Sequence, residues 1–250
     1  VTALTFNGGS STVTAQPPET WRFFTVTVPA APLGWDLRIH TVTDGSPALV
    51  VRRDLLPDGT FSSFWNPSQS TTWPSGEQWG ATNDWTSRQN DPSGPVPFQN
   101  RLICGAGQPL VAGTYLVGVY NNSTTNDATY TVQSRGIGAG LALPVTALAF
   151  AAGSSAVVPA TAARQTRFFS VTVPAATPRW GFTLTATTGD WTVAARRGTI
   201  PDLLASASGD LDSTNPANDN EVLLHKTGSE SFLMLPLDGA ATLAAGTYFI

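Results

Sequence analysis

Apolar and polar side chains alternate along several short segments of this chain. Between Arg22 and Val28, the side chains of Phe24, Val26 and Val28 fall on one face and the residues between them fall on the other. The same period of two runs through Trp35–His40, Tyr115–Tyr120 and Thr129–Val132. This period is typical of half-buried strands, and the Gly, Pro, Asn and Asp clusters between these segments are typical of turns. The pattern predicts an all-β chain whose antiparallel sheets pack as a sandwich.

The sequence also repeats itself. Residues 1–11 return as residues 145–155 with eight of eleven positions identical, and residues 22–31 return as residues 167–176 with nine of ten identical. Further matches keep the same order: Trp35 with Trp180, Arg52-Arg53 with Arg196-Arg197, and Ala112–Tyr115 with Ala245–Tyr248. The repeat predicts two tandem antiparallel β-sandwich domains of jelly-roll-like form, at residues 1–135 and 145–250, joined by a linker at residues 136–144.

The spacing between matched segments locates an insertion. Matched residues lie 144 to 145 positions apart early in each unit but 133 positions apart at the Ala-Gly-Thr-Tyr segment. The first unit therefore carries about eleven extra residues, within a Trp-rich insertion at about residues 61–99.

The second unit lacks the end of the first. After Tyr115 the first unit continues through another strand at residues 128–133, whereas the second unit stops at Ile250, two residues beyond Tyr248. A sandwich that lacks a final strand exposes an unpaired edge. We therefore expect either that the chain is a fragment of a longer protein or that a neighbouring molecule supplies the strand, as in a filament.

Each unit resembles the bacterial pre-peptidase C-terminal domain, a β-sandwich of secreted proteins. The segments that carry the resemblance are Phe23–Ala31, Ala48–Arg53, Trp191–Gly198, Gly113–Val119 and Tyr130–Val132. The Gly-Asp-x-Asp loop of that family is not kept, because Gly189-Asp190 lacks the second aspartate. The resemblance implies an extracellular accessory domain without catalytic activity.

Composition and charge exclude several classes of protein. The chain has 13 Lys and Arg against 17 Asp and Glu, and Lys226 is the single lysine. Nucleic-acid binding, which needs clustered basic residues, is therefore not expected. No apolar run approaches the roughly 20 residues of a membrane helix, so no membrane span is expected. Cys104, the single cysteine, is expected to be a small buried hydrophobe.

Catalytic motifs are missing from the sequence. The two histidines, His40 and His225, both follow strand-like segments and are expected to lie on strand faces. No nucleophile elbow and no His-Glu-x-x-His pattern occurs. We therefore predict that the chain is not an enzyme.

An acidic stretch offers a candidate calcium site. Asp210, Asp212, Asp219 and Glu221 lie in one loop with several asparagines. Carboxylate and amide oxygens are the ligands that calcium prefers. The alternative is a solvated loop that uses Asp and Asn to form turns, with no cofactor at all.

Four tryptophans form the other candidate site. Trp65, Trp73, Trp79 and Trp85 crowd into the insertion, among Pro, Ser, Thr, Gly, Asn and Gln. Exposed indoles stack on sugar rings or contact other proteins, whereas buried indoles would form a small core for the insertion itself. The second unit has no such cluster.

Together these features predict a non-catalytic structural or adhesive module of a larger secreted or cell-surface bacterial protein. Its expected partners are other domains of the same polypeptide, glycans or neighbouring subunits. The alternatives are a carbohydrate-binding accessory module of a secreted hydrolase and a subunit of an extracellular filament.

Overall fold

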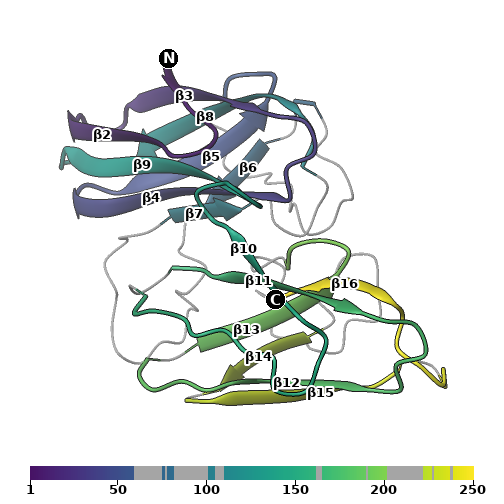
Figure 1. Ribbon diagram of the computed structural model, residues 1–250. Coiled ribbons are helices and arrows are strands. Elements are labelled where there is room, and N and C mark those ends of the chain that lie inside the picture. Colours follow the sequence, from purple (N-terminus) through teal and green to yellow (C-terminus); the bar gives the residue numbers. More distant parts are fainter. Residues whose placement is uncertain are drawn as a thin grey trace.

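The computed structural model describes residues 1–58, 75–76, 78–81, 101–104, 110–161, 165–189, 191–201, 222–226, 228–236 and 239–250. All regular structure in these ranges is β-strand (Figure 1), which confirms the predicted all-β fold of packed antiparallel sheets. No helix in the described ranges is long and apolar enough to cross a membrane.

The N-terminal half (residues 1–137) forms two sheets. Its strands are β1 (Thr2–Leu4), β2 (Gly9–Gln16), β3 (Trp21–Val28), β4 (Gly34–Asp44), β5 (Pro47–Arg53), β6 (Gln78–Ala81), β7 (Arg101–Cys104), β8 (Gly113–Asn121) and β9 (Ala128–Ile137). One sheet has the order β1-β3-β8-β5-β6 and the other has the order β2-β9-β4-β7. All neighbouring strands are antiparallel except β1 and β3, which are parallel.

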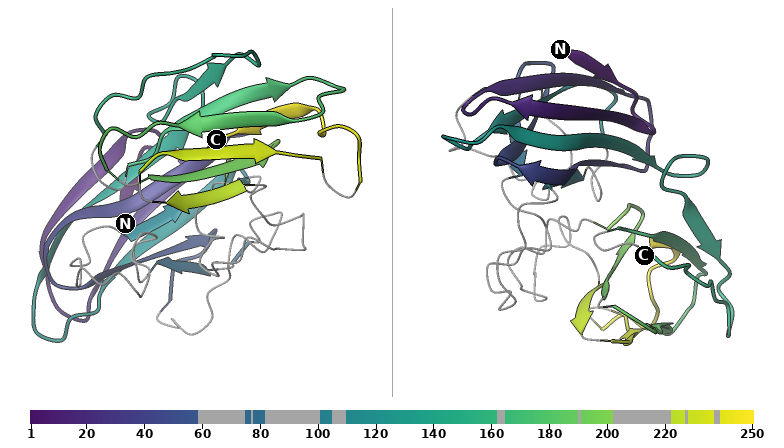
Figure 2. Two further views of the ribbon diagram at one scale, coloured as in Figure 1. Left: turned by 90° about the horizontal axis from the view of Figure 1, so that it is seen from below. Right: turned by 90° about the vertical axis from the view of Figure 1, so that its left-hand side faces the viewer.

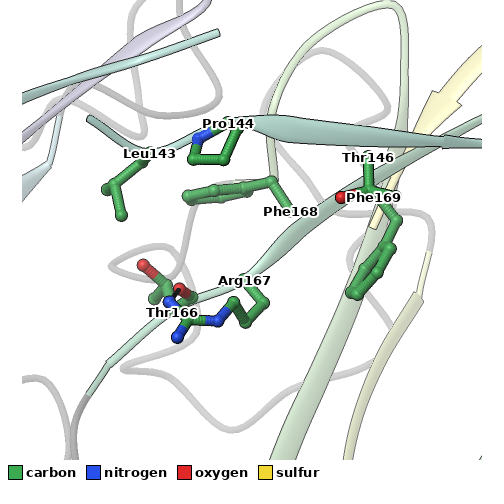
Figure 3. Close-up of a pocket in the computed structure, with 7 residues that line it drawn as sticks. All are labelled: Leu143, Pro144, Thr146, Thr166, Arg167, Phe168 and Phe169. Atoms are coloured by element: carbon green, nitrogen blue, oxygen red, sulfur yellow. Dashed lines mark hydrogen bonds between the residues drawn. The ribbon is translucent and has the colours of Figure 1, made fainter. Parts of the chain in front are cut away.

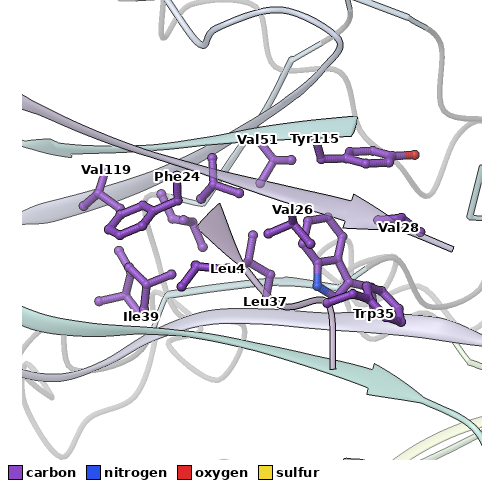
Figure 4. Close-up of a cluster of buried hydrophobic side chains, with 14 of the residues drawn as sticks. Leu4, Phe24, Val26, Val28, Trp35, Leu37, Ile39, Val51, Tyr115 and Val119 are labelled. Atoms are coloured by element: carbon purple, nitrogen blue, oxygen red, sulfur yellow. The ribbon is translucent and has the colours of Figure 1, made fainter. Parts of the chain in front are cut away.

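The core of this half lies between the two sheets (Figure 4). The alternating apolar residues of β3 and β4 meet there, and Phe24, Val26, Trp35 and Leu37 are all 1% exposed or less. Tyr115 on β8 packs edge-on against Trp35, with ring centroids 5.5 Å apart. The period of two thus turns one face of each strand inward, and burial of that face stabilises the sandwich.

The C-terminal half (residues 143–250) repeats this plan, with fewer strands among its described residues. Its strands are β10 (Val145–Leu148), β11 (Phe168–Val173), β12 (Trp180–Leu184), β13 (Trp191–Arg197), β14 (Val222–Lys226), β15 (Glu230–Met234) and β16 (Gly246–Phe249). One sheet has the order β10-β11-β16-β13-β14, and β12 and β15 pair as a second sheet. No sheet among the described residues mixes strands of the two halves, which lie as separate groups of sheets in Figures 1 and 2.

Matched residues of the two halves make the same contacts. β10 runs parallel to β11 as β1 does to β3, and the rings of Trp180 and Tyr248 lie 5.5 Å apart at 65°, as those of Trp35 and Tyr115 do. The Tyr115 hydroxyl donates to the Val111 carbonyl at 2.8 Å. The same bond recurs from Tyr248 to Ala244 at 2.9 Å.

The residues of the C-terminal half that match the core of the N-terminal half are only partly buried. Val171 is 4% exposed, but Phe169, Trp180 and Phe182 are half-buried. Phe169 is therefore less covered than its counterpart Phe24, which is 1% exposed. The sheet that should cover these side chains has two described strands instead of four.

The missing cover corresponds to β2 and β9. Residues 153–160 match β2 in sequence, yet they form no strand. Val157 is 95% exposed, whereas its counterpart Val13 is 6% exposed. No described strand of the C-terminal half occupies the place of β9.

Gly45 allows a tight turn to approach β9, and its replacement by alanine should be costly. Gly45 and Gly140 both have a φ of +73°, but a Cβ on Gly45 would lie 2.6 Å from the Ala128 Cα, whereas a Cβ on Gly140 meets nothing within 4 Å. Gly140→Ala should cost about 1–2 kcal/mol of unfolding free energy, the usual strain of a left-handed residue. Gly45→Ala should lower the free energy of unfolding by more than Gly140→Ala does, as measured by urea denaturation. Equal losses for the two variants would contradict the close approach of Gly45 to Ala128.

Candidate functional site

The four predicted ligand-binding tryptophans fall largely outside the described residues. Trp65, Trp73 and Trp85 are not among the described residues. The backbone of Trp79 lies on β6, opposite Val51 on β5. The aromatic site therefore stays a prediction.

The candidate calcium ligands Asp210, Asp212, Asp219 and Glu221 also lie outside the described residues. Across the part of the chain that the structure describes, no three His, Cys, Asp or Glu side chains come close enough to hold a metal ion. Calcium binding therefore stays a prediction of the sequence.

A charged cluster lies on the outer face of the sheet β2-β9-β4-β7. Trp35, Leu37 and Ile39 point into the core, so the alternate residues Asp36 and Arg38 point away from it. Both are nevertheless only 2% exposed. Charged residues are rarely buried to this extent unless they are paired.

The carboxylate of Asp36 accepts hydrogen bonds from two arginine side chains. Arg38 donates to it through Nε at 2.8 Å and through Nη2 at 2.6 Å, and Arg135 on β9 donates to it through Nη2. Arg135 also donates to the Gln165 side chain, just before β11, at 2.8 Å. The cluster therefore ties β4 to β9 and ties the N-terminal half to the start of the C-terminal half.

This arrangement serves structure better than catalysis. A carboxylate that accepts three hydrogen bonds from two guanidinium groups has its oxygens occupied and is poorly placed to contact a substrate. Sequence reasoning missed the cluster. Its signal was the placement of Asp36 and Arg38 at the polar positions of an otherwise apolar strand.

His40 is the next residue on this face. It lies opposite Thr131 on β9, and its Nδ1 is 2.8 Å from the Thr41 hydroxyl. Its Nε2 is buried and has no hydrogen-bond partner among the described residues. Burial, followed by the charges of Arg38 and Arg135, lowers the pKa of His40, while Asp36 acts in the opposite direction. The other histidine, His225, lies on β14 opposite Thr192.

The lowered pKa of His40 predicts a loss of stability in mild acid. In the unfolded chain His40 takes up a proton near its ordinary pKa of 6.5, whereas the folded chain keeps it neutral to lower pH. Protonation therefore favours unfolding, and the unfolding free energy should fall as the pH drops below 6.5. His40→Asn should show a shallower fall between about pH 7 and pH 5 in urea denaturation. Equal slopes would contradict this assignment.

Backbone and side-chain contacts also hold the segment that links the two halves, residues 136–143. The backbone forms a parallel bridge between Ile137 and Leu143, with Leu143 donating to the Gly136 carbonyl and Gly138 donating to the Leu143 carbonyl, both at 3.0 Å. Ile137 and Leu143 then pack with Phe168 and Ile200 in a separate buried apolar cluster. These residues form the junction (residues 136–143 with Phe168 and Ile200).

A small pocket opens beside this junction (Figure 3). Leu143, Pro144 and Thr146 line it together with Thr166–Phe169, and its volume is about 90 Å³. Ligand pockets usually measure roughly 300–1,000 Å³, so this space suits water or a small ion better than a sugar ring. The Thr166 hydroxyl is buried and has no hydrogen-bond partner among the described residues.

The edge of β12 is the other candidate surface. β12 pairs with β15 through five residues, from Trp180 opposite Met234 to Leu184 opposite Glu230. No strand among the described residues pairs with its other edge. An exposed strand edge presents unpaired backbone groups that another strand can bind.

Comparison with known proteins does not assign this chain to a family. No family model matches the sequence, and no curated protein matches it.

Proposed function

We propose that the chain is a non-catalytic structural or adhesive module of a larger extracellular or cell-surface protein. The observation that carries this proposal is the junction. A backbone bridge, a buried apolar cluster and the hydrogen bond from Arg135 to Gln165 all join the two halves. Contacts of this kind suit a stiff spacer, which holds neighbouring domains at a set separation.

The outer surface supports an extracellular setting. Threonine and serine occupy many outward positions of the strands, and pairs such as Thr12 with Thr131 and Thr172 with Thr247 face each other across neighbouring strands. Such faces need few charges to stay hydrated, in keeping with charged residues at only 12% of the chain. The resemblance to the pre-peptidase C-terminal domain supports the same setting.

The buried charges support a role without catalysis. Asp36 and Arg38 bond to each other and to Arg135, so their chemistry is used in holding two strands and the junction together. A carbohydrate-binding role would rest instead on Trp65, Trp73, Trp79 and Trp85. Glycan-array binding that disappears on their replacement by alanine would favour that alternative.

The location of the protein tests the extracellular part of the proposal. An antibody raised against the chain should label intact cells that make the protein, and trypsin added outside should remove the label. Labelling only after permeabilisation would contradict the proposal. Turnover of peptide or glycan substrates by the purified chain would contradict its non-catalytic part.

A further inference from the structure

The segment that links the two halves, residues 136–143, is anchored to the N-terminal half. The Ala142 backbone donates to the Asn7 side-chain oxygen at 2.6 Å. A Cβ on Gly136 would lie only 2.6 Å from Phe6 Cε1, so the chain leaves β9 in close contact with the Phe6 ring. The backbone bridge described above then closes the segment on itself. These contacts fix the segment to the N-terminal half.

The apolar side chains of the same segment are buried against the C-terminal half. Ile137 and Leu143 are 0% and 4% exposed, and they pack with Phe168 and Ile200. Phe168 lies on the face of β11 opposite to Val171, which belongs to the C-terminal core. The segment therefore covers an outward apolar face of the C-terminal half.

The matched positions of the N-terminal half are less buried. Phe23 and Leu56 correspond in the repeat to Phe168 and Ile200. Leu56 is 49% exposed and Phe23 is half-buried, whereas Ile200 and Phe168 are 0% and 6% exposed. A sandwich of this kind does not need these side chains to be buried, so their burial in the C-terminal half belongs to the junction.

A directional contact lies beside this apolar one. Burial of apolar surface is non-directional, and it does not by itself select one angle between the halves. Arg135 Nη1 donates to the Gln165 side-chain oxygen at 2.8 Å, and Nη2 of the same guanidinium group donates to the Asp36 carboxylate. Because a guanidinium group is planar and rigid, the positions of its two partners depend on each other.

The Asp36 carboxylate holds this guanidinium group from the N-terminal side. The Asp36 and Arg38 side chains are 2% exposed, and Arg38 donates to Asp36 through two nitrogens. Both residues lie on β4, which is paired with β7 on one edge and with β9 on the other. A continuous set of contacts thus runs from the middle of one sheet, through Arg135, to the residue just before β11.

We propose that Arg135 fixes the relative orientation of the two halves and that the buried carboxylate of Asp36 positions Arg135 for this role. Ile137 and Leu143 bring the halves together, and the bond from Arg135 to Gln165 selects one angle between them. Arg135 is therefore a positioning residue. The proposal rests on the stiff spacer proposed above and identifies the side chains that make it stiff.

Double electron–electron resonance on the full chain measures this orientation. Nitroxide labels are placed at Thr14→Cys and Thr172→Cys, two exposed strand positions in different halves, and Cys104→Ser removes the single native cysteine. The labelled chain should give one narrow distance distribution. Gln165→Ala and Arg135→Lys should each widen it, because alanine removes the acceptor and a lysine ammonium cannot reproduce the planar fork of the guanidinium group.

Matched variants separate orientation from stability. Gln133→Ala makes the same change on the same face of β9 as Arg135 and should leave the distribution narrow. Ile200→Ala should widen the distribution, whereas the corresponding Leu56→Ala should not. The urea midpoint of Gln165→Ala should stay close to that of the unsubstituted chain.

Asp36→Asn tests the second part of the proposal. It should widen the distribution although the change lies within the N-terminal half, because Arg135 loses the charge that positions it. Near-ultraviolet circular dichroism shows whether this variant is folded. If it is not, Arg135→Lys and Gln165→Ala decide the outcome.

The results distinguish this proposal from the one on which it rests. A broad distribution in the unsubstituted chain would contradict the stiff spacer, and the role of Arg135 with it. A narrow distribution that Arg135→Lys and Gln165→Ala leave unchanged would overturn the role of Arg135 and leave the spacer intact. Equal widening by Gln133→Ala would also overturn the role of Arg135.

Discussion

Replacing Trp35 by alanine should lower the free energy of unfolding by about 3–5 kcal/mol, the usual cost of emptying a buried aromatic site. The Trp35 side chain is fully buried, packs edge-on against Tyr115 and donates to the Ser134 hydroxyl. Urea denaturation followed by far-UV circular dichroism measures the loss.

Trp180→Ala is the matched control in the other half. The residue type, its position in the repeat and its ring contact with Tyr248 are all the same. Trp180 is half-buried, however, and less apolar surface is removed from water around it. We expect a loss of about 1–3 kcal/mol, in proportion to its smaller buried area. A larger loss of unfolding free energy for Trp180→Ala than for Trp35→Ala would contradict the lower burial of Trp180.

Asp36→Asn should lower the free energy of unfolding by roughly 3–5 kcal/mol, about as much as Trp35→Ala. Breaking a buried ion pair is this costly because it leaves a buried charge without compensation. Asparagine has almost the same shape, so packing stays unchanged while the guanidinium groups of Arg38 and Arg135 lose their shared counter-charge. The Asp36 and Arg38 side chains are 2% exposed, and water cannot replace the lost interaction. The loss is measured by urea denaturation at neutral pH.

Asp54→Asn makes the same chemical change at the surface. Asp54 lies 3.6 Å from Arg53 Nε, and its side chain is 41% exposed. Surface ion pairs contribute about 0–1 kcal/mol, and asparagine tolerates the φ of +66° found at this position. A loss at Asp54 equal to that at Asp36 would show that the effect at Asp36 does not come from burial.

The strands and the repeat could be read from the sequence because their causes are local. A period of two at Phe24, Val26 and Val28 is sufficient to set the inward face of β3. Identical residues at matched positions of the two units make the same Trp–Tyr contact. The common face of Phe24, Val26 and Val28 was predicted for this reason, and all three residues are buried.

Other features depend on contacts between distant segments. Asp36 and Arg135 are 99 positions apart, and no local pattern indicates that β9 would bring them together. Residues 153–160 match the sequence of β2 and would be expected to form a strand. A strand needs a pairing partner, however, and none is described beside these residues. The same absence leaves Phe169 half-buried although its local pattern is that of Phe24.

Amide hydrogen exchange of the isolated chain tests most directly whether the C-terminal half lacks the strand that corresponds to β9. Residues 9–16 should be strongly protected, because β2 pairs with β9, whereas the matched residues 153–160 should exchange at nearly the rate of an unstructured chain. At the same time, residues 180–184 should exchange faster than residues 35–40. Equal protection of residues 9–16 and 153–160 in a monomeric sample would contradict the open edge.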